Sequence, residues 1–190
     1  MRSNNQQQER FFELLEPELP RLQAFCLKLA GHPEKGDDLM QDALYDAWKG
    51  FGKLRHATAF KPWLYQITVY RYRTNWRKFN KQEDFTQPLS NDVVDEVQSH
   101  MRFVRDRLNL AMTSLSATDK ALVTLHELEG WSYSDLAVML QSSEGALRTR
   151  LTRCRNKMRK TLQKHIEQTS GDSLAIGVDK EWFVVKQEKR

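Results

Sequence analysis

Apolar residues recur at intervals of three and four along most of the chain, the spacing that gathers them on one face of an α-helix. The pattern predicts helices over residues 20–30, 34–49 and 58–81, and a second helical group over residues 94–162. A short apolar turn at 11–15 precedes the first helix, and residues 31–33 and 50–57 interrupt the pattern. The N-terminal half shows no strand-rich pattern. The sequence therefore predicts an all-α fold.

The two helical groups are separated by residues 82–98, which contain several acids, one proline and no lysine or arginine. This composition indicates a linker. We therefore expect two small helical domains, 9–81 and 99–162, joined by a flexible acidic linker at 82–98.

Residues 131–160 predict a helix-turn-helix whose second helix is strongly basic. Ser132, with Asp135 three residues later, can cap the first helix. Ser142 or Ser143 can cap the second helix. The apolar stripe of that helix consists of Leu147, Leu151, Cys154 and Met158, and another face presents Arg148, Thr149, Thr152 and Arg153. Such a helix fits the major groove of DNA, where arginine reaches guanine edges. The alternative is a solvated basic helix on a helical bundle.

The helix over 34–49 has an apolar stripe and, about half a turn away, a polar face. The polar face consists of Asp38, Gln41, Asp42 and Tyr45. A catalytic use of these carboxylates would need a metal or a dry cleft, and neither His32 nor a nearby Glu offers metal-ligand spacing. We therefore expect no metal and no cofactor. The face is either solvated or a docking surface for a basic protein patch.

The helix that follows Pro62 mixes aromatic residues with cations as far as Lys81. Its first turns are expected in the core, whereas the segment after Tyr70 is expected to be too basic to be buried. Exposed aromatic rings beside Arg and Lys suit contact with unstacked bases and a strand backbone. The alternative is a helix whose long side chains cover the edges of the core while their charged ends reach water.

The charge distribution favours an anionic partner. The 190 residues carry a formal net charge of +5, with basic blocks at 71–81 and 148–164 on either side of the acidic stretch. Cys26 and Cys154 fall at apolar positions of helical patterns, so we expect buried free thiols. The N-terminus has no apolar signal core and no run reaches membrane-spanning length. We therefore expect a cytoplasmic protein without membrane insertion.

Three separate motifs resemble the sigma-70 family, most closely its extracytoplasmic-function (ECF) branch, over residues 9–162. Residues 37–48, DDLMQDALYDAW, resemble the region 2.2 motif, and residues 60–67, FKPWLYQI, resemble the start of the helix of regions 2.3 and 2.4. Residues 115–158 follow the region 4 pattern, including ELEGWSY at 127–133 and GALRTRL at 145–151. A lone helix-turn-helix would be a weak signal, but the order and spacing of all three motifs match.

The resemblance implies a promoter-specificity subunit of bacterial RNA polymerase that is not itself an enzyme. Asp38, Gln41, Asp42 and Tyr45 would dock on the clamp helices of the largest polymerase subunit, and the flap would be a further polymerase contact. The −10 promoter element would be recognised and opened through Lys53, Arg55, Tyr70, Arg71, Arg73, Thr74, Arg77 and Lys78. The −35 element would be read through Ser143, Arg148, Thr149, Thr152 and Arg153. An anti-sigma factor, commonly at the membrane, would be another partner.

Three features depart from the family pattern. Tyr70 stands where Asn is frequent and Thr74 where Asp or Asn is frequent, so the −10 preference is expected to be unusual. Gln141 and Ser142 replace a Gly and an apolar residue in the turn, so either residue 141 adopts a costly left-handed conformation or the turn differs. Residues 163–190 are a C-terminal extension outside the resemblance, which could form a hairpin, dock on region 4 or be a disordered tail.

A stand-alone helix-turn-helix regulator of transcription is the alternative function. It would need a sensory or dimerisation module in residues 1–90, which instead carry the region 2 motifs. An enzyme such as a serine recombinase would need an α/β domain, and the N-terminal half does not show the strand pattern of one.

Overall fold

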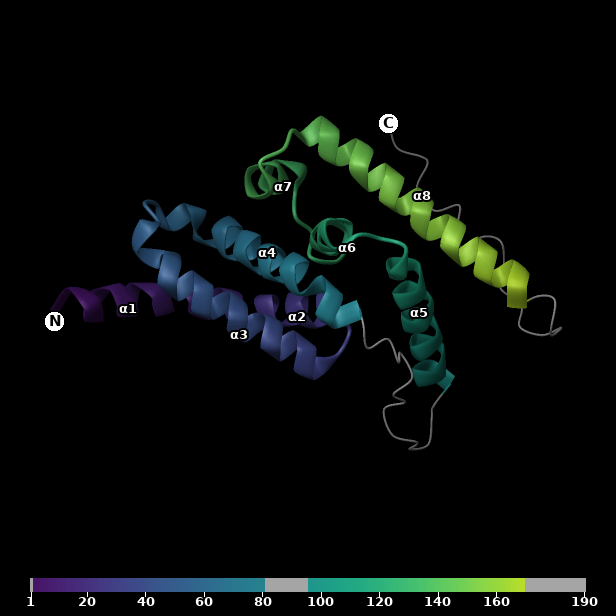
Figure 1. Ribbon diagram of the computed structural model, residues 1–190, viewed down its shortest axis with the longest axis horizontal. Helices are drawn as coiled ribbons and strands as arrows, with labels where there is room; N and C mark the ends of the chain where they lie inside the picture. The colour runs from purple at the N-terminus through teal and green to yellow at the C-terminus, as the bar shows by residue number, and fades with distance from the viewer. Residues whose placement is uncertain (1, 81–95, 170–190) are drawn as a thin grey trace.

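The computed structural model describes residues 2–80 and 96–169, and every regular element in these ranges is a helix (Figure 1). The α-helices are α1 Arg2–Leu15, α2 Leu19–Ala30, α3 Pro33–Gly50, α4 Phe60–Asn80, α5 Glu96–Thr113, α6 Ala117–Val123, α7 Tyr133–Leu140 and α8 Glu144–Thr169. Short 3₁₀ turns cover Glu16–Glu18 (η1), Phe51–Lys53 (η2) and Ala57–Ala59 (η3), and a π-helical turn covers Thr124–Leu128 (η4). The predicted all-α fold is confirmed.

Helices α2, α3 and α4 pack together as the first helical group. Gly31 ends α2 with a left-handed φ of 72°, and Pro33 opens α3 where no intrahelical donor is needed. The two helices approach each other closely at Gly36, where an added Cβ would meet the Cα of Leu27 at 2.9 Å. Only glycine permits this approach, which fixes α3 against α2.

Helix α1 is longer than the short apolar turn predicted at residues 11–15. Its first residues are polar and carry no apolar period that a sequence pattern could reveal. The helix is attached by Phe11, whose ring makes edge contacts with Trp48, Phe51 and Phe60 at centroid distances of 5.3, 5.1 and 5.8 Å. These contacts place α1 at the end of the group where α3 meets α4.

The second helical group, α5 to α8, begins its helices as the capping pattern predicts. The hydroxyl of Ser116 accepts a hydrogen bond from the amide of Asp119 at 3.2 Å, and that of Ser132 accepts one from the amide of Asp135 at 3.1 Å. The π-helical turn that follows α6 was not predicted, since no sequence period marks it.

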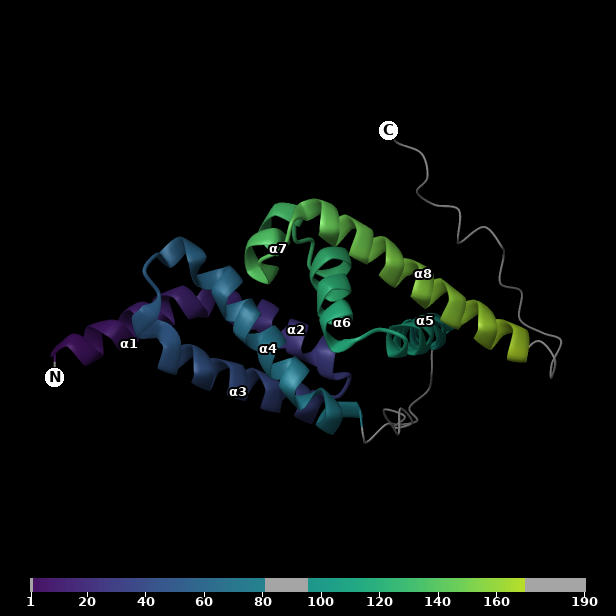
Figure 2. The same ribbon diagram turned by 45° about the horizontal axis from the view of Figure 1, so that its top comes forward.

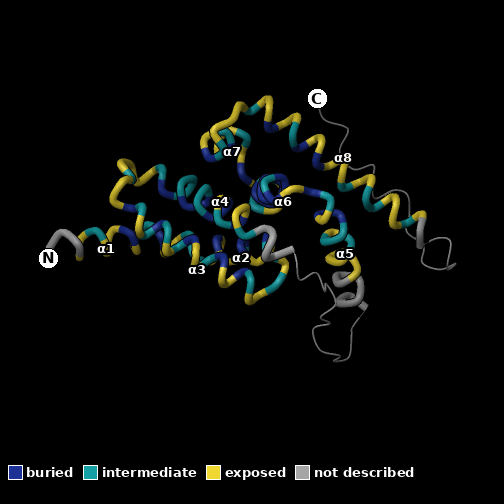
Figure 3. The backbone as a smooth tube through the Cα atoms, in the orientation of Figure 1, coloured by how far each residue is buried: buried dark blue, intermediate teal, exposed yellow. Residues whose placement is uncertain are grey.

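The two helical groups, which the sequence predicts to be two domains joined by a linker, lie against each other (Figure 2). Helix α4 contacts α6 and α7, and α2 contacts η4. Buried residues of both groups form one continuous cluster, and Figure 3 shows the largely buried α6 beside α4. The contact matters for function because α4 and the helix-turn-helix carry the predicted DNA-binding residues.

The boundaries of the predicted linker and extension can be compared with the structure only in part. Residues 82–95 of the linker lie outside the described residues, whereas residues 96–98 belong to α5. Helix α8 continues past residue 162 and ends at Thr169. The apolar clusters of the C-terminal extension also lie outside the described residues.

Candidate nucleic-acid interface

The predicted helix-turn-helix is formed by α7, a three-residue turn and α8. Gln141 ends α7 in the left-handed region, with φ 51° and ψ 49°, and is the one non-glycine residue of the described chain with a positive φ. Ser143 then caps α8, because its hydroxyl accepts a hydrogen bond from the amide of Ala146 at 3.3 Å. Of the two alternatives for this turn, residue 141 therefore adopts the left-handed backbone conformation. Gln141 has the strain in this conformation that a glycine would avoid.

One face of α8 is buried and another is free. Leu147, Leu151 and Cys154 are each 1% exposed or less, which fixes the rotation of the helix. The five residues predicted to read the −35 element are all exposed: Ser143, Arg148, Thr149, Thr152 and Arg153. The structure therefore gathers the predicted residues on the solvent side of one helix.

The two threonines on this face present their methyl groups and oxygen lone pairs rather than a free donor. The Thr149 hydroxyl donates to the carbonyl of Gly145 at 3.0 Å, and the Thr152 hydroxyl donates to the carbonyl of Arg148 at 3.0 Å. Apolar contact with a thymine methyl group suits such a surface.

The two arginines on this face differ in how firmly they are held. Arg148 donates to Glu144 one turn earlier at 2.9 Å, and its guanidinium lies 4.9 Å from the centre of the Tyr133 ring. Arg153 makes no ion pair with any residue that the structure describes. Tyr133 and Glu144 therefore orient Arg148, whereas Arg153 is free to follow a partner. No local pattern predicts this role of Tyr133, because the contact depends on how α7 packs on α8.

Other cations of α8 hold the domain together instead of facing a partner. Arg150 donates to the carboxylate of Asp119 on α6 at 2.7 Å, and Arg155 donates to Glu127 at 3.0 Å. Burial would raise the pKa of Asp119, but the hydrogen bonds from Arg150 and Ser116 outweigh it and lower that pKa. Arg150 and Arg155 are thus braces between α8 and the helical segment that precedes the motif.

Helix α4 carries the second predicted DNA surface, and its residues fall into different environments. Tyr70 is 60% exposed, and Arg73 and Thr74 are also exposed. Tyr72 is only 1% exposed, so the expectation that the segment after Tyr70 is too basic to be buried was wrong at this position. Tyr72 lies three residues after the buried Val69, so both side chains are on the inward face of α4. The neighbouring Arg71 pairs with Asp46, and Arg73 is exposed to solvent. Arg77 and Lys78 lie on α4, beyond the residues whose side chains are described.

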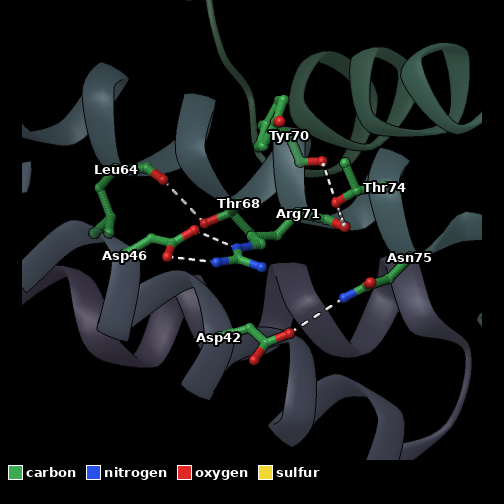
Figure 4. Close-up of polar contacts among 8 residues, drawn as sticks. All are labelled: Asp42, Asp46, Leu64, Thr68, Tyr70, Arg71, Thr74 and Asn75. Carbon is green, nitrogen blue, oxygen red and sulfur yellow. Dashed lines mark hydrogen bonds and ion pairs between the residues drawn. The ribbon is translucent and has the colours of Figure 1, made fainter. Parts of the chain in front are cut away.

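Arg71 faces α3 rather than open solvent (Figure 4). Its Nε and Nη2 both donate to the carboxylate of Asp46, with Nη2 2.5 Å from Oδ1. The hydrogen bonds from Arg71 hold the pKa of Asp46 below its usual value. A second tie joins the same helices, since Asn75 donates to Asp42 at 3.2 Å. Any contact of Arg71 with DNA would therefore have to compete with Asp46.

The loop that leads into α4 leaves its cations unengaged. Lys53 and Arg55 are exposed, and neither pairs with a residue in the described part of the chain. Phe51 and Phe60 on either side of the loop are buried and anchor it to the core of the first group. The loop thus projects two free cations beside the start of α4.

The polar face of α3 is exposed as predicted. Asp38, Gln41, Asp42 and Tyr45 are all exposed, and Tyr45, 58% exposed, lies beneath the amine of Lys49 at 4.2 Å from its ring centre. Asp42 is also the acceptor for Asn75, so this face is tied directly to α4. The roles of Asp46 and Asn75 were not predicted, because no sequence pattern marks partners that are 25 and 33 residues apart.

Among the described residues, no three His, Cys, Asp or Glu side chains are placed to hold a metal ion. Cys26 and Cys154 are buried free thiols, as predicted. Burial raises the pKa of Cys26 to about 12 and that of Cys154 to about 11. None of the described helices is both long enough and apolar enough to cross a membrane.

Comparisons with known protein families match both helical groups. The family described as "Sigma-70 region 2" matches residues 14–82, and the family described as "Sigma-70, region 4" matches residues 105–158. The RNA polymerase sigma factor CarQ of Myxococcus xanthus is 27% identical over 161 residues, covering 82% of this chain and 90% of CarQ. The ECF RNA polymerase sigma factor SigE of Mycolicibacterium smegmatis is 27% identical over 164 residues, covering 83% of this chain and 63% of SigE.

Two solved structures are similar to most of this chain. A co-crystal structure of the sigma factor RpoE with the anti-sigma factor NepR from Bartonella quintana gives a TM-score of 0.58 at 26% identity, covering 80% of this chain and 96% of RpoE. The structure of CnrH in complex with the cytosolic domain of CnrY gives a TM-score of 0.58 at 20% identity, covering 87% and 91% of the two chains. The second likeness shows the fold alone.

Proposed function

The chain belongs to the sigma-70 family, as an ECF-type sigma factor with regions 2 and 4, and we propose that its exposed polar surfaces divide promoter recognition between them. Sigma factors are non-catalytic subunits of RNA polymerase that initiate transcription at promoters. Region 2 comprises residues 14–82, and region 4 comprises residues 105–158.

The observation that carries the proposal is the exposed face of α8. Four exposed residues, among them two arginines, lie on α8, and the exposed Ser143 caps this helix, whose opposite face is buried in the domain. A single α-helix fits the major groove, and guanidinium groups there recognise guanine while threonine methyls contact thymine. We therefore assign reading of the −35 element to Ser143, Arg148, Thr149, Thr152 and Arg153.

Region 2 would act on the −10 element through the loop before α4 and through α4 itself. Opening a duplex costs a few kcal/mol for each unstacked base, so contacts available only to the separated strand must offset that cost. Lys53, Arg55, Arg73 and the exposed Tyr70 offer free charge and an aromatic face for such contacts. Arg71 would hold α4 in position through its hydrogen bonds to Asp46, and it would not be a primary contact with the separated strand.

Asp38, Gln41, Asp42 and Tyr45 would form the surface that docks on the polymerase. Their exposure on one face of α3, away from the buried Leu39 and Ala43, leaves them available to a partner of opposite charge. The hydrogen bonds between Asp42 and Asn75 and between Asp46 and Arg71 join α3 to α4. The position of α3 on the polymerase would therefore determine the position of α4.

An anti-sigma factor is the further partner that the relatives support. RpoE was solved with NepR, and CnrH with the cytosolic domain of CnrY. A partner of this kind would hold the protein inactive by covering the surfaces that face the polymerase. The site of action would be the cytoplasm, where the polymerase transcribes.

In-vitro transcription tests the function. Purified protein and core RNA polymerase would be incubated with fragmented genomic DNA of the encoding organism, and transcript 5′ ends would be mapped. We expect a defined set of starts that appears only when both proteins are present. Site-specific DNA binding by the isolated chain at about 0.15 M salt, with no dependence on polymerase, would instead indicate a stand-alone regulator.

A further inference from the structure

Helix α8 is longer than the segment proposed to read bases. It spans 26 residues, Glu144–Thr169, whereas the match to region 4 ends at residue 158 and the proposed base-reading residues end at Arg153. At 1.5 Å per residue the helix is about 39 Å long. The major groove is about 12 Å wide and winds around the duplex, so a straight helix of this length leaves it after a few turns. The last turns of α8 also extend past α5 (Figures 1 and 2).

A row of lysines prolongs the proposed reading face along α8. Arg153 is followed by Lys157, Lys160 and Lys164, at intervals of four, three and four residues, which places the four side chains on one side of the helix. All four are exposed. We call Lys157, Lys160 and Lys164 the lysine stripe. It begins one turn after the last proposed base-reading residue and carries the same face about 16 Å farther along the helix.

The amines of the lysine stripe are not engaged by the protein itself. None of the three forms an ion pair or donates a hydrogen bond to a residue that the structure describes. The neighbouring arginines of α8 differ in this respect, since Arg155 donates to Glu127 at 3.0 Å and Arg159 donates to Asn156 at 3.2 Å. The side of the helix that follows Arg153 therefore keeps its cations available to an anionic partner.

The type of side chain changes where the lysine stripe begins. The proposed reading face uses arginine and threonine, whereas all cations of the stripe are lysines. The planar fork of arginine matches the edge of a base, whereas the lysine amine is a flexible point charge that suits a phosphate. DNA bound at Arg153 would also bring its backbone to Lys157, one turn away. The nearest anions to the stripe would then be phosphates of the same duplex.

We infer that the lysine stripe is a second DNA contact of α8, which binds backbone phosphates on one flank of the −35 element without reading their sequence. This inference rests on the proposed reading of the −35 element by α8. Duplex DNA carries one negative charge for about every 1.7 Å of its axis, so such a contact is available beside any −35 sequence. The stripe raises the affinity for the promoter and its salt dependence, and it leaves the choice of promoter to the residues before it.

The salt dependence of promoter binding tests the inference with holoenzyme that contains the full chain. One variant combines Lys157→Gln, Lys160→Gln and Lys164→Gln, because glutamine removes the charge and has a similar helix propensity. Each lost phosphate contact lowers the slope of log affinity against log salt by about 0.9, so we expect a total decrease of about 2–3. The ratio of affinities for promoters with intact and altered −35 elements should not change. Equal slopes for wild type and this variant would overturn the inference.

A charge-preserving variant and a footprint complete the design. Replacing the same three lysines by arginine keeps the charge and should rescue the wild-type slope. In hydroxyl-radical footprints, wild-type holoenzyme should protect the −35 element and the adjoining backbone on one flank, and the glutamine variant should lose only the flanking protection. Unchanged protection together with reduced transcription would assign the stripe to an acidic protein surface and overturn the inference.

Binding of the free full-length chain to a duplex of random sequence separates this inference from the proposed function. A phosphate contact needs no promoter, so the glutamine variant should show a smaller salt slope than wild type here as well. If wild-type holoenzyme bound no promoter specifically, the proposed function would fail, while the slopes on random duplex would still report on the lysines. Equal slopes on random duplex would count against the stripe alone.

Discussion

At the residue scale, single side chains decide how the helix-turn-helix is held and what it presents. Gln141 bears a left-handed backbone, Tyr133 and Glu144 orient Arg148, and Arg153 stays free. These differences separate a residue that shapes the motif from residues that are proposed to read DNA, and they make two predictions possible.

Replacing Gln141 by glycine should stabilise the protein. The left-handed conformation costs a non-glycine residue about 1–2 kcal/mol, and the greater freedom of glycine in the unfolded chain offsets part of that gain. We expect the free energy of unfolding to rise by about 0.5–1 kcal/mol in urea titrations. Ser142→Gly is the control, because Ser142 has no positive φ and should gain nothing. A loss of stability in Gln141→Gly would contradict the strain argument.

Arg148→Ala and Arg153→Ala should each reduce discrimination between −35 sequences by about 1–3 kcal/mol, because a bidentate contact with a base is lost. Lys160→Ala, farther along α8, should weaken binding alike on all sequences and lower its salt dependence. Holoenzyme affinities for a panel of single-base −35 variants would measure both effects. If Arg148→Ala weakened every variant equally, its role would be phosphate contact rather than base reading.

At the element scale, ion pairs join helices that carry different surfaces. Asp46 and Arg71 connect α3 to α4, and Asp119 and Arg150 connect α6 to α8. Each pair fixes the direction of a helix whose exposed face is proposed to bind a partner. The consequences can be measured separately as stability and as promoter opening.

Arg150→Ala should lower stability by about 1–2 kcal/mol at neutral pH, because the partly buried Asp119 loses a charge-assisted hydrogen bond. The pKa of Asp119 is lowered in the folded protein, so its contribution is present above the unfolded-state pKa, near 4, and disappears as the pH falls through the folded pKa. The difference from wild type should therefore shrink in urea titrations below about pH 4. Arg153→Ala, which removes an unpaired arginine, should change stability by no more than about 0.5 kcal/mol. A difference that stayed constant with pH would exclude the pair as its cause.

Replacing Arg73 and Arg77 together by Ala should permit polymerase binding but impair promoter opening, while the Arg71–Asp46 tie is left intact. Contacts with the separated strand must offset an opening cost of a few kcal/mol per unstacked base. A promoter with a pre-melted bubble should restore much of the activity, since that cost is then already met. Thymines as reactive to permanganate as with wild type on a linear duplex would show that these cations do not assist melting.

At the scale of the whole molecule, regions 2 and 4 lie against each other around Trp131, Tyr65 and the Lys28–Glu129 ion pair. Charge reversal at Lys28 or Glu129 should open the free protein, because each change sets like charges against each other. Lys28 is 40% exposed, so the effect on the ratio of closed to open forms should be modest, roughly two- to fivefold. The radius of gyration from small-angle scattering should rise in each single variant.

The double variant with Lys28→Glu and Glu129→Lys is the internal control for this prediction. It restores opposite charges across the interface and should return the radius of gyration toward the wild-type value. Recovery in the double variant distinguishes a broken ion pair from a folding defect. Scattering curves that are identical in all four proteins would show that the pair does not stabilise the closed form.

Local sequence alone determined most of the helices and their starts. The capping pairs Ser116–Asp119 and Ser132–Asp135, the buried stripe of α8 and the exposed polar face of α3 depend only on residues within a few positions of one another. Helical periodicity and capping are local effects, so they can be recognised without tertiary information. The family motifs, which are also short stretches of sequence, predicted the function as well.

Only the tertiary structure decided which cations are free and how the two regions meet. Sequence patterns do not distinguish the arginines of α4 from one another, nor those of α8. In the folded chain, however, Arg71 pairs with Asp46 and Arg150 pairs with Asp119. Their partners lie 25 and 31 residues away, and such pairings depend on the crossing of helices rather than on local spacing. The burial of Tyr72 and the contact between Trp131 and Tyr65 likewise follow from surfaces that meet only in the folded chain.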